Sequence, residues 1–490
     1  MSHYDVVIVG AGLSGIGAAV HLQQHCPDRT FAILESRATI GGTWDLYRYP
    51  GIRSDSDMHT LGYSFKPWRA EKSIADGPSI LEYVNETADQ HACREKIRFN
   101  RQLTGAAWST DDARWTLDVA PTDDGEVEPL SCNVLLMCSG YYSYDEPHHP
   151  HFEDQEAFEG RIFHPQFWPE DLDYRGKRVV VIGSGATAVT IIPAIADEAA
   201  HVTMLQRSPT YVVAAPDKDV IANTLRKFLP GMWAYKLTRF KNTQLQRIMY
   251  ARTRSAPDKV KSFLLARVRK ALGPDYDVEK HFTPRYNPWD QRLCLIPNGD
   301  LWEAIREGKA SVVTEQIDRF TKGGIRLQTG EELDADIIVV ATGLNLTLLG
   351  GTRFEVDGEP VSFPETFTYK GMMYSDVPNL IQTFGYINAS WTLRADLTAE
   401  YACRLLNRMD ELGMRQCTPR LRERDRGMTK RLWVEDFSSG YLRRGLPAFP
   451  KQGDHAPWLN TQNFAADKKM VRHAPLEDGA LTFSSPKADR

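Results

Sequence analysis

One arrangement of apolar and polar residues occurs twice along the chain. An apolar run at residues 5–9 leads into a glycine-rich turn at residues 10–15, and a helix-like segment at residues 16–22 comes next. The same order returns within residues 178–194. A short apolar run that ends at such a turn is typical of a buried parallel strand, and the segment behind it is typical of a helix. The pattern therefore predicts two strand–turn–helix units in an α/β chain.

The first turn has the glycine spacing of a dinucleotide-binding loop. Gly10 would permit a tight turn, Gly12 would let the backbone approach a pyrophosphate, and Gly15 would permit close packing of the helix on the strand. The pyrophosphate would lie at the N-terminus of the helix. A second apolar run, residues 30–34, ends at Glu35, at about the distance expected of an acid that binds the ribose. Together these features predict a nucleotide site, for which the glycine spacing alone would be weak support.

The second turn differs from the first in the residues beyond its helix. It reads Gly-Ser-Gly-Ala-Thr-Ala at residues 183–188, and the apolar run at residues 202–205 leads to Arg207 and Ser208 without an acid. An acid would bond a free ribose hydroxyl, whereas an arginine with a hydroxyl suits a ribose that carries a phosphate. The second site is therefore predicted to bind NADPH rather than NADH, although a surface arginine after a strand is also common.

Two nucleotide sites in one chain indicate a flavoprotein in which FAD occupies the first site and NADPH delivers a hydride from the second. Two further apolar runs, residues 135–140 and 336–343, each end in glycine. They are interpreted as strands at which the chain leaves and re-enters the FAD domain. The predicted fold is α/β with two Rossmann-like dinucleotide-binding domains, the NADPH domain being inserted into the FAD domain, plus a helical insertion at about residues 220–285. The expected domains are the first part of the FAD domain at 1–145, the NADPH domain at 146–335, and the return of the FAD domain with the C-terminal segment at 336–490.

Composition narrows the class of protein. The chain has 490 residues, 42% of them hydrophobic, which suffices for two or three domains. A net charge of −5 and the lack of interleaved basic and aromatic residues argue against a nucleic-acid partner. The seven cysteines are scattered and lack a Cys-x-x-Cys pair, which suggests a reducing cytoplasm and argues against a redox disulfide. The chain starts with strand-like residues instead of a signal peptide and has no apolar stretch of about 20 residues, so a cytoplasmic location is expected.

Two clusters of charged or titratable residues allow more than one interpretation. His148, His149 and His151 are interrupted by a proline and are interpreted as a solvated loop, so no metal is expected. From Ile221 to Lys270 the chain holds thirteen lysines and arginines and one acid, between apolar residues at approximately helical spacing. Basic amphipathic helices can lie on anionic membranes, so peripheral membrane contact is one hypothesis. Helices that cover a substrate entrance or an oligomer interface are the other, and the oligomeric state stays open.

Two longer motifs match a known family. Residues 158–169 read Phe-Glu-Gly-Arg-Ile-Phe-His-Pro-Gln-Phe-Trp-Pro, and residues 41–55 match a second signature, Gly-Gly-x-Trp-x-x-x-x-(Phe or Tyr)-Pro-Gly-x-x-x-Asp. The fixed positions of the first motif are Phe158, Gly160, His164 and Trp168. On these motifs the chain resembles, over essentially its whole length, the type I Baeyer–Villiger monooxygenases of the flavin-containing monooxygenase superfamily. The resemblance is greatest to the ethionamide-activating branch, with which residues 286–292 and 388–392 are shared.

This resemblance implies a reaction and its cofactors. An enzyme of this family binds FAD and NADPH, consumes O2 and, through a flavin peroxide, inserts one oxygen atom beside a carbonyl, so that a ketone becomes an ester or a lactone. Oxidation of sulfur in thioethers or thioamides is also implied. The alternatives are an amine- or sulfide-oxidising monooxygenase, an NADPH oxidase or quinone reductase, and a non-catalytic flavoprotein that senses NADPH.

The resemblance assigns the oxygen chemistry to Arg292. A fixed guanidinium would stabilise the peroxide and then the adduct formed at the carbonyl, while a surface salt bridge is its alternative role. Asp55 matches the carboxylate that faces both the flavin and this arginine, although it could instead cap a helix near Ser56 and Asp57. Gln291 replaces a lysine of many relatives, which leaves more of the NADPH preference to the second turn.

The other site residues are assigned by the same resemblance. The residues expected to contact FAD, besides the first glycine loop, are Ser14, Glu35, Thr43, Trp44, Asp45, Leu46, Asp55 and Leu103. The residues expected to contact NADP are Arg53, Ser54, Gly183, Ser184, Gly185, Ala186, Thr187, Ala188, Val189, Arg207 and Ser208. Trp391 is expected to line the substrate pocket. The motif around His164 is expected to coordinate movement of the NADPH domain, and a loop histidine satisfied by nearby backbone is the alternative.

Overall fold

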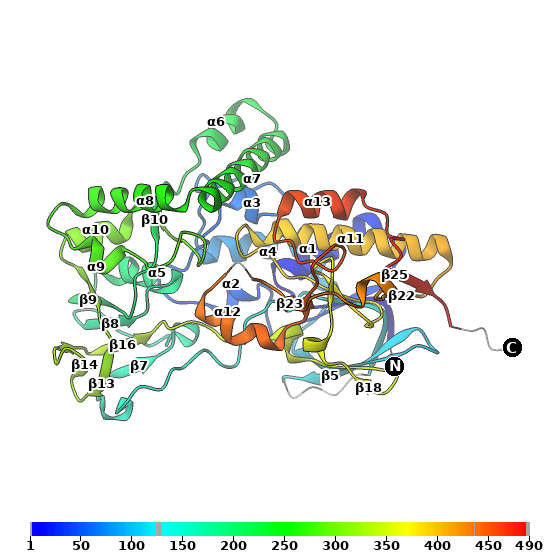
Figure 1. Ribbon diagram of the computed structural model, residues 1–490, viewed down its shortest axis with the longest axis horizontal. Helices are drawn as coiled ribbons and strands as arrows, with labels where there is room; N and C mark the ends of the chain where they lie inside the picture. Colours follow the sequence, from blue (N-terminus) through cyan, green and yellow to red (C-terminus); the bar gives the residue numbers. More distant parts are fainter. Residues whose placement is uncertain (1, 124, 126–128, 436, 487–490) are drawn as a thin grey trace.

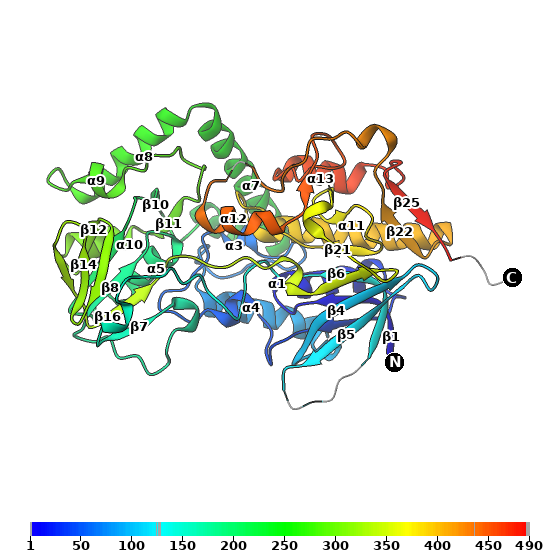
Figure 2. The ribbon, with the colours of Figure 1, turned by 60° about the horizontal axis from the view of Figure 1, so that its bottom comes forward.

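Two sheets with helices against them make up the computed structural model, which describes residues 2–123, 125, 129–435 and 437–486. The sheets lie side by side along the long axis of the molecule (Figure 1, Figure 2). The predicted α/β class with two Rossmann-like units is confirmed. Residues 1 and 490, the outer limits of the expected domains, lie outside the described residues.

The first sheet has nine strands in the order β18-β17-β4-β5-β6-β1-β2-β3, with β21 paired to β6. Its strands are β1 (Ser2–Val9), β2 (Phe31–Leu34), β3 (Ile97–Arg98), β4 (Arg101–Ser109), β5 (Arg114–Pro121), β6 (Leu130–Met137), β17 (Arg353–Val356), β18 (Glu359–Pro360) and β21 (Leu380–Gln382). Val6 and Ile8 of β1 pack in one core with helices α1 (Leu13–His25) and α11 (Trp391–Leu412), whereas Val7 packs on the other face with β4 and β5. Burial on both faces explains why this central strand is an uninterrupted apolar run.

The second sheet is parallel throughout and has the order β12-β9-β8-β16-β7. Its strands are β7 (Arg161–Phe163), β8 (Arg178–Ile182), β9 (His201–Gln206), β12 (Ala310–Thr314) and β16 (Ile337–Val340). Helices α5 (Ala186–Ile195) and α10 (Asp300–Arg306) share its apolar core. A small antiparallel sheet beside it contains β13 (Ile317–Thr321), β14 (Gly324–Leu327) and β15 (Glu332–Asp334).

The strand expected to return the chain to the first sheet belongs instead to the second. β16 pairs in parallel with both β8 and β7. The chain rejoins the first sheet only with β17, which pairs with β4. The interpretation of residues 336–343 as a strand of the first sheet is therefore wrong, and β16, just after the predicted boundary at residue 335, belongs to the second sheet. An apolar run that is buried on both faces does not reveal which of two parallel sheets it joins.

The predicted helical insertion is confirmed, and the chain enters and leaves it at neighbouring positions of the second domain. Its helices are α6 (Val220–Phe228), α7 (Gly231–Ser255), α8 (Pro257–Leu272) and α9 (Val278–Phe282). The two strands that flank it, β10 (Val212–Ala215) and β11 (Cys294–Pro297), pair in parallel. Helix α6 and its turn into α7 are the outermost part of the molecule at the top of Figure 1.

The remaining elements cover the first sheet and the C-terminal part of the chain. They are α2 (Thr43–Leu46), α3 (Met58–Leu61), α4 (Gly77–Gln90), α12 (Gly440–Gly445), α13 (Phe464–His473), β19 (Thr368–Tyr369), β20 (Met373–Tyr374), β22 (Gln416–Pro419), β23 (Arg431–Leu432), β24 (Lys451–Gln452) and β25 (Leu481–Ser484), besides short 3-10 turns. Helix α13 packs on α11 in the same core as α1. Within the described part of the chain, no helix is both long enough and apolar enough to cross a bilayer.

Candidate functional site

A cavity of about 660 Å³ lies where the two glycine-rich turns approach each other. Its volume is in the range of small-molecule and cofactor sites. The first domain contributes the turn after β1 and the end of β2, and the second contributes Ala186 and Thr187 at the start of α5. Arg292, from the segment after the helical insertion, completes the wall between them. The carboxyl ends of parallel strands from both sheets thus open into one cavity, as in other nucleotide-binding α/β proteins.

The turn after β1 can pack this closely against its neighbours only because of its glycines. Gly10 has a φ of +102°, and a Cβ atom there would lie 2.7 Å from the carbonyl oxygen of Cys138. A Cβ atom on Gly15 would lie 1.8 Å from the carbonyl oxygen of Gly10, which supports the predicted role of Gly15 in packing the helix. Gly12 precedes α1 and gives it no side-chain cap, so the first backbone N–H groups of the helix remain available to an anion. This geometry fits the pyrophosphate of FAD.

Glu35 is fixed at the end of β2 by two backbone groups. Its Oε2 accepts from the N–H of Ala11 at 2.7 Å, and its Oε1 accepts from the N–H of Arg37 at 2.9 Å. The side chain lines the cavity although the residue is buried, and burial raises the pKa of its carboxyl group. A carboxylate held in this way fits a ribose hydroxyl.

Arg292 and Asp55 meet across the domain boundary. The guanidinium Nη1 donates to Oδ2 of Asp55 at 2.8 Å, and Nη2 donates to the carbonyl oxygen of Ile387 at 3.2 Å. The negative charge of Asp55 raises the pKa of Arg292 further above its ordinary value. Asp55 does not cap helix α3, because Asp57 does so by accepting from the N–H groups at positions 59 and 60. The alternative role suggested for Asp55 is therefore wrong.

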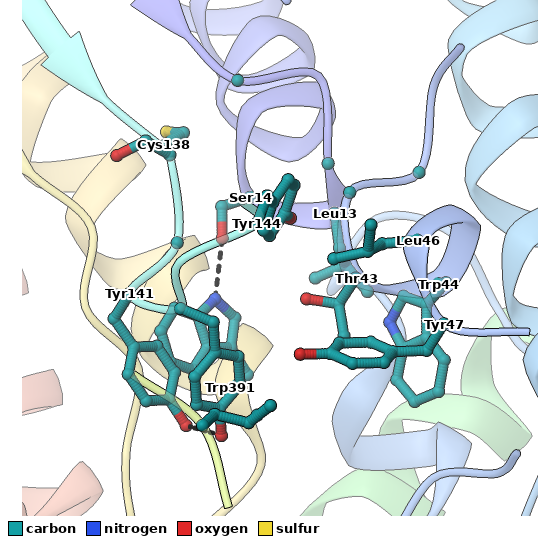
Figure 3. Close-up of a pocket in the computed structure, with 18 of the residues that line it drawn as sticks. Leu13, Ser14, Thr43, Trp44, Leu46, Tyr47, Cys138, Tyr141, Tyr144 and Trp391 are labelled. Atoms are coloured by element: carbon teal, nitrogen blue, oxygen red, sulfur yellow. Dashed lines mark hydrogen bonds between the residues drawn. The ribbon is translucent and has the colours of Figure 1, made fainter. Parts of the chain in front are cut away.

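An aromatic wall faces the first turn. Trp391 donates its Nε1–H to Oγ of Ser14 at 2.7 Å, and its ring stacks on Tyr141 with the centroids 5.1 Å apart. Figure 3 shows these three residues on one side of the cavity, with Thr43, Trp44, Leu46 and Tyr47 across from them. Trp391 thus lines this cavity, and its contact with a substrate stays a prediction.

Sequence reasoning missed the tyrosines of this cavity. They are Tyr47, Tyr49, Tyr386, Tyr141, Tyr142 and Tyr144. The last three come directly after β6, and residues after the carboxyl end of a parallel strand are where ligands bind in such sheets. Their position after β6 was the feature of the sequence that could have identified these three tyrosines as cavity residues. Burial raises the pKa values of Tyr141 and Tyr142 well above the ordinary value of a tyrosine, so both side chains remain neutral beside Arg292.

The second turn is more open than the first. Of its predicted nucleotide contacts, Ala186 and Thr187 line the cavity, while the side chains of Ala188 and Val189 are buried in the core under α5. Ser184 donates its Oγ–H to the carbonyl oxygen of Ser208 at 3.2 Å. The predicted residues at the exposed rim of the turn, outside the cavity wall, are Gly185, Arg207 and Ser208.

The other predicted contacts divide into two groups. Those that line the cavity are Ser14, Thr43, Trp44, Leu46, Arg53, Ser54 and Leu103. The side chain of Asp45 does not, because its Oδ2 accepts from Arg37 and from Thr39, each at 2.5 Å. The side chain of Asp45 is thus engaged outside the cavity, and a contact of Asp45 with FAD stays a prediction. Because Asp45 lies in the same short helix as Thr43, the sequence pattern did not indicate that its side chain turns away from the cavity.

The motif at residues 158–169 holds together the two segments that connect the domains, one after β6 and the other after β16. Nδ1 of His164 accepts from the N–H of Gln166 at 3.1 Å, so Nε2 carries the proton and donates to the carbonyl oxygen of Gly343 at 3.0 Å. Burial lowers the pKa of His164 to about 4, which keeps it neutral. The Gln166 amide donates to the carbonyl oxygens of Ser143 and Tyr144 at 3.0 and 2.8 Å. One short segment therefore binds the outgoing and the returning linker together.

The other fixed positions of the motif pack against the second sheet. A Cβ atom on Gly160 would lie 2.4 Å from the carbonyl oxygen of Asp336, just before β16. Phe158 is buried against that sheet, and Trp168 meets Phe163 edge to face at 5.1 Å. These contacts explain why the motif requires a glycine and aromatic residues at this spacing.

Comparisons with known proteins agree with the architecture of the site. Residues 72–349 match the flavin-binding monooxygenase-like family, and residues 8–70 match the NAD(P)-binding Rossmann-like domain. The chain is 52% identical over 487 residues to the FAD-containing monooxygenase EthA of Mycobacterium tuberculosis, with 99% of each chain covered. It is 47% identical to the probable FAD-binding monooxygenase AlmA of Acinetobacter baylyi, over 98% of this chain and 96% of that protein.

A solved structure has the same fold over the whole chain. The steroid monooxygenase bound to NADP superimposes with a TM-score of 0.79 at 23% identity, and the match covers 99% of this chain and 100% of that one. Family match, full-length identity and fold thus agree, and the chain belongs to the flavin-binding monooxygenase-like family as a flavin monooxygenase.

Proposed function

We propose that this flavin monooxygenase is a Baeyer–Villiger enzyme that uses FAD, NADPH and O2 to convert a ketone into an ester or a lactone. The sulfur of thioethers and thioamides is its second substrate class. One oxygen atom of O2 enters the product, the other leaves as water, and NADPH supplies the two electrons. The observation that carries the proposal is Arg292, paired with Asp55 at 2.8 Å in a cavity that both glycine-rich turns border.

FAD is assigned to the first turn. Gly12 leaves the N-terminus of α1 without a side-chain cap, where a pyrophosphate can bind, and Glu35 offers a fixed carboxylate to the ribose. When bound, FAD supplies the redox chemistry, because it can accept a hydride from NADPH and pass electrons to O2. The relatives named as FAD-containing monooxygenases support this assignment.

NADPH is assigned to the second turn. Thr187 and Ala186 face the cavity, and Arg53 and Ser54 face it from the first domain. The exposed pair at the end of β9, Arg207 with Ser208, suits the 2′-phosphate that distinguishes NADPH from NADH. The solved structure of a steroid monooxygenase with NADP supports the same use of the fold.

Arg292 holds a positive charge at the centre of the cavity. A guanidinium has five N–H donors, and its bonds to Asp55 and Ile387 occupy two of them. The raised pKa keeps the group charged at any physiological pH. Arg292 therefore stabilises the negative charge that develops on oxygen when a carbonyl is attacked, and Asp55 orients the guanidinium for that role.

Product analysis tests the proposal directly. The purified enzyme with FAD and NADPH is given a simple cyclic ketone and, separately, a thioether. One lactone formed for each NADPH consumed supports the Baeyer–Villiger assignment. Sulfoxide without any lactone contradicts it and favours an amine- or sulfide-oxidising monooxygenase. Hydrogen peroxide as the sole product contradicts it in favour of an NADPH oxidase.

A further inference from the structure

Exposed apolar side chains gather on the helical insertion. Among the residues that the structure describes, twelve large hydrophobic side chains are exposed, and ten of them lie between Val220 and Phe263. The residue exposure reaches 79% for Phe228 and 64% for Trp233. Single exposed apolar residues are ordinary on soluble proteins, but a contiguous group marks an interaction surface.

Three of these side chains form a stripe along helix α7. Trp233, Leu237 and Phe240 are four and three residues apart and so lie in one stripe along the helix. The opposite face attaches the helix to the first domain, because Tyr235 is buried and Arg239 donates to three backbone carbonyls of residues 59–62. The inner face therefore fixes the helix, whereas the three side chains of the stripe are 46–64% exposed.

The charge around the stripe is strongly positive. Residues 221–270 carry thirteen basic residues and one acid, a net +12, in a chain whose net charge is −5, so the rest of the chain carries −17. Lys227, Lys236 and Arg247 are exposed next to the apolar residues and form no ion pair with other described residues. Lys236 and Arg247 are about three helical turns apart and so run beside the stripe.

We propose that α6 and the outer face of α7 form a docking surface for an anionic lipid bilayer. Phe228, Trp233 and Leu237 enter the interfacial region, and the basic side chains lie at the level of the headgroups. An anionic bilayer satisfies both the apolar stripe and the unpaired cations. A symmetric contact with a second copy of the chain would instead bring two segments of net +12 together.

The docking surface also borders a second cavity, of about 480 Å³, between α7, α11 and α13. Lys236 and Phe240 belong to both the surface and this cavity. Ala389 lines this cavity and the cofactor cavity as well. A lipid-soluble substrate would therefore leave the bilayer close to Arg292, a consequence that rests on the proposed function, whereas docking itself does not.

Vesicle flotation of the FAD-loaded enzyme tests the proposal. Vesicles of phosphatidylcholine with phosphatidylglycerol are compared with vesicles of phosphatidylcholine alone, and the enzyme is expected to float with the anionic vesicles. The double substitution Trp233→Glu and Leu237→Glu is expected to weaken this binding at least about tenfold. It replaces two apolar side chains with negative charges, which the anionic headgroups repel. The matched control is Leu432→Glu, since Leu432 is 46% exposed but lies on β23 away from the insertion; it is expected to bind like the wild type.

Three results would overturn docking: wild-type enzyme that does not float, a double variant that floats as well as the wild type, or a wild-type dimer that the double variant converts to monomer without any vesicle binding. Thermal unfolding checks that the variant is folded. Turnover of a water-soluble ketone without vesicles separates membrane docking from the proposed enzymatic function. A variant that no longer floats but retains wild-type turnover has lost docking and not catalysis.

Discussion

The two glycine-rich turns share an order of residues but differ in their surroundings. A Cβ atom on Gly12 in the first turn would lie 3.5 Å from the Cα of Gly42, whereas a Cβ atom on the corresponding Gly185 would meet nothing within 4 Å. The loop that carries Gly42 closes over the first turn, and the second turn stays open at the surface. This difference suits a cofactor that remains bound at the first turn and one that exchanges at the second.

The largest expected effect comes from placing the same side chain in both turns. Gly12→Val is expected to lower FAD affinity by about 100-fold or more, because the side chain fills the space between Gly12 and Gly42 where the pyrophosphate approaches. Gly185→Val is expected to retain FAD and to raise the KM for NADPH. Flavin absorbance per protein measures the first effect, and initial rates measure the second. Equal FAD loss in both variants would remove the proposed contrast between the turns.

The linkers between the two regions depend on a neutral His164. Its pKa is lowered from 6.5 to about 4 by burial, so between these values the unfolded chain binds a proton that the folded chain does not. The contribution of His164 to stability is therefore present near neutral pH and is lost as the pH falls, by about 2 kcal/mol between pH 7 and pH 5. His164→Gln lacks this titration. Chemical unfolding of both proteins at the two pH values measures the difference, and an identical pH dependence would refute it.

The coenzyme preference of the second turn can be tested at its rim. Arg207→Ala is expected to raise the KM for NADPH about tenfold and to leave that for NADH unchanged, because one charge-assisted contact with the 2′-phosphate is lost. FAD content is expected to stay that of the wild type. A parallel rise in both KM values would assign Arg207 a structural role.

A smaller effect is expected on the aromatic wall of the first turn. Trp391→Phe removes the 2.7 Å hydrogen bond to Ser14 but keeps the ring stacked on Tyr141. FAD affinity is expected to fall about fivefold, which corresponds to one neutral hydrogen bond. Titration of the apoprotein with FAD measures this change, and Tyr141→Phe, which keeps both the ring and the bond to Ser14, serves as the matched control.

Local spacing made part of this molecule predictable from sequence. The glycines of the first turn and Glu35 are linked by a short strand–helix–strand unit, so their spacing in sequence determines their proximity in space. Arg292 and Asp55, which are far apart in the chain, were identified by resemblance to a family motif, and the structure pairs them.

Other features depend on long-range packing that the sequence pattern does not encode. The run that forms β16 suits either parallel sheet equally, and pairing with β7 and β8 decides between them. Asp45 lies within a motif that lines the cavity, yet Arg37 and Thr39 turn its side chain away. Tyr141, Tyr142 and Tyr144 lie outside both family motifs and become recognisable only from their place after β6.

The central claim is that Arg292, between the two turns, serves oxygen transfer and not nucleotide binding. Arg292→Ala in one preparation allows both steps to be measured: anaerobic reduction of FAD by NADPH, and lactone formed from a cyclic ketone. The expected result is reduction within about threefold of the wild-type rate and lactone formation lowered by about 100- to 1,000-fold, with the consumed NADPH recovered as hydrogen peroxide. Lactone formation at the wild-type rate, or an equal loss of both steps, would contradict the claim.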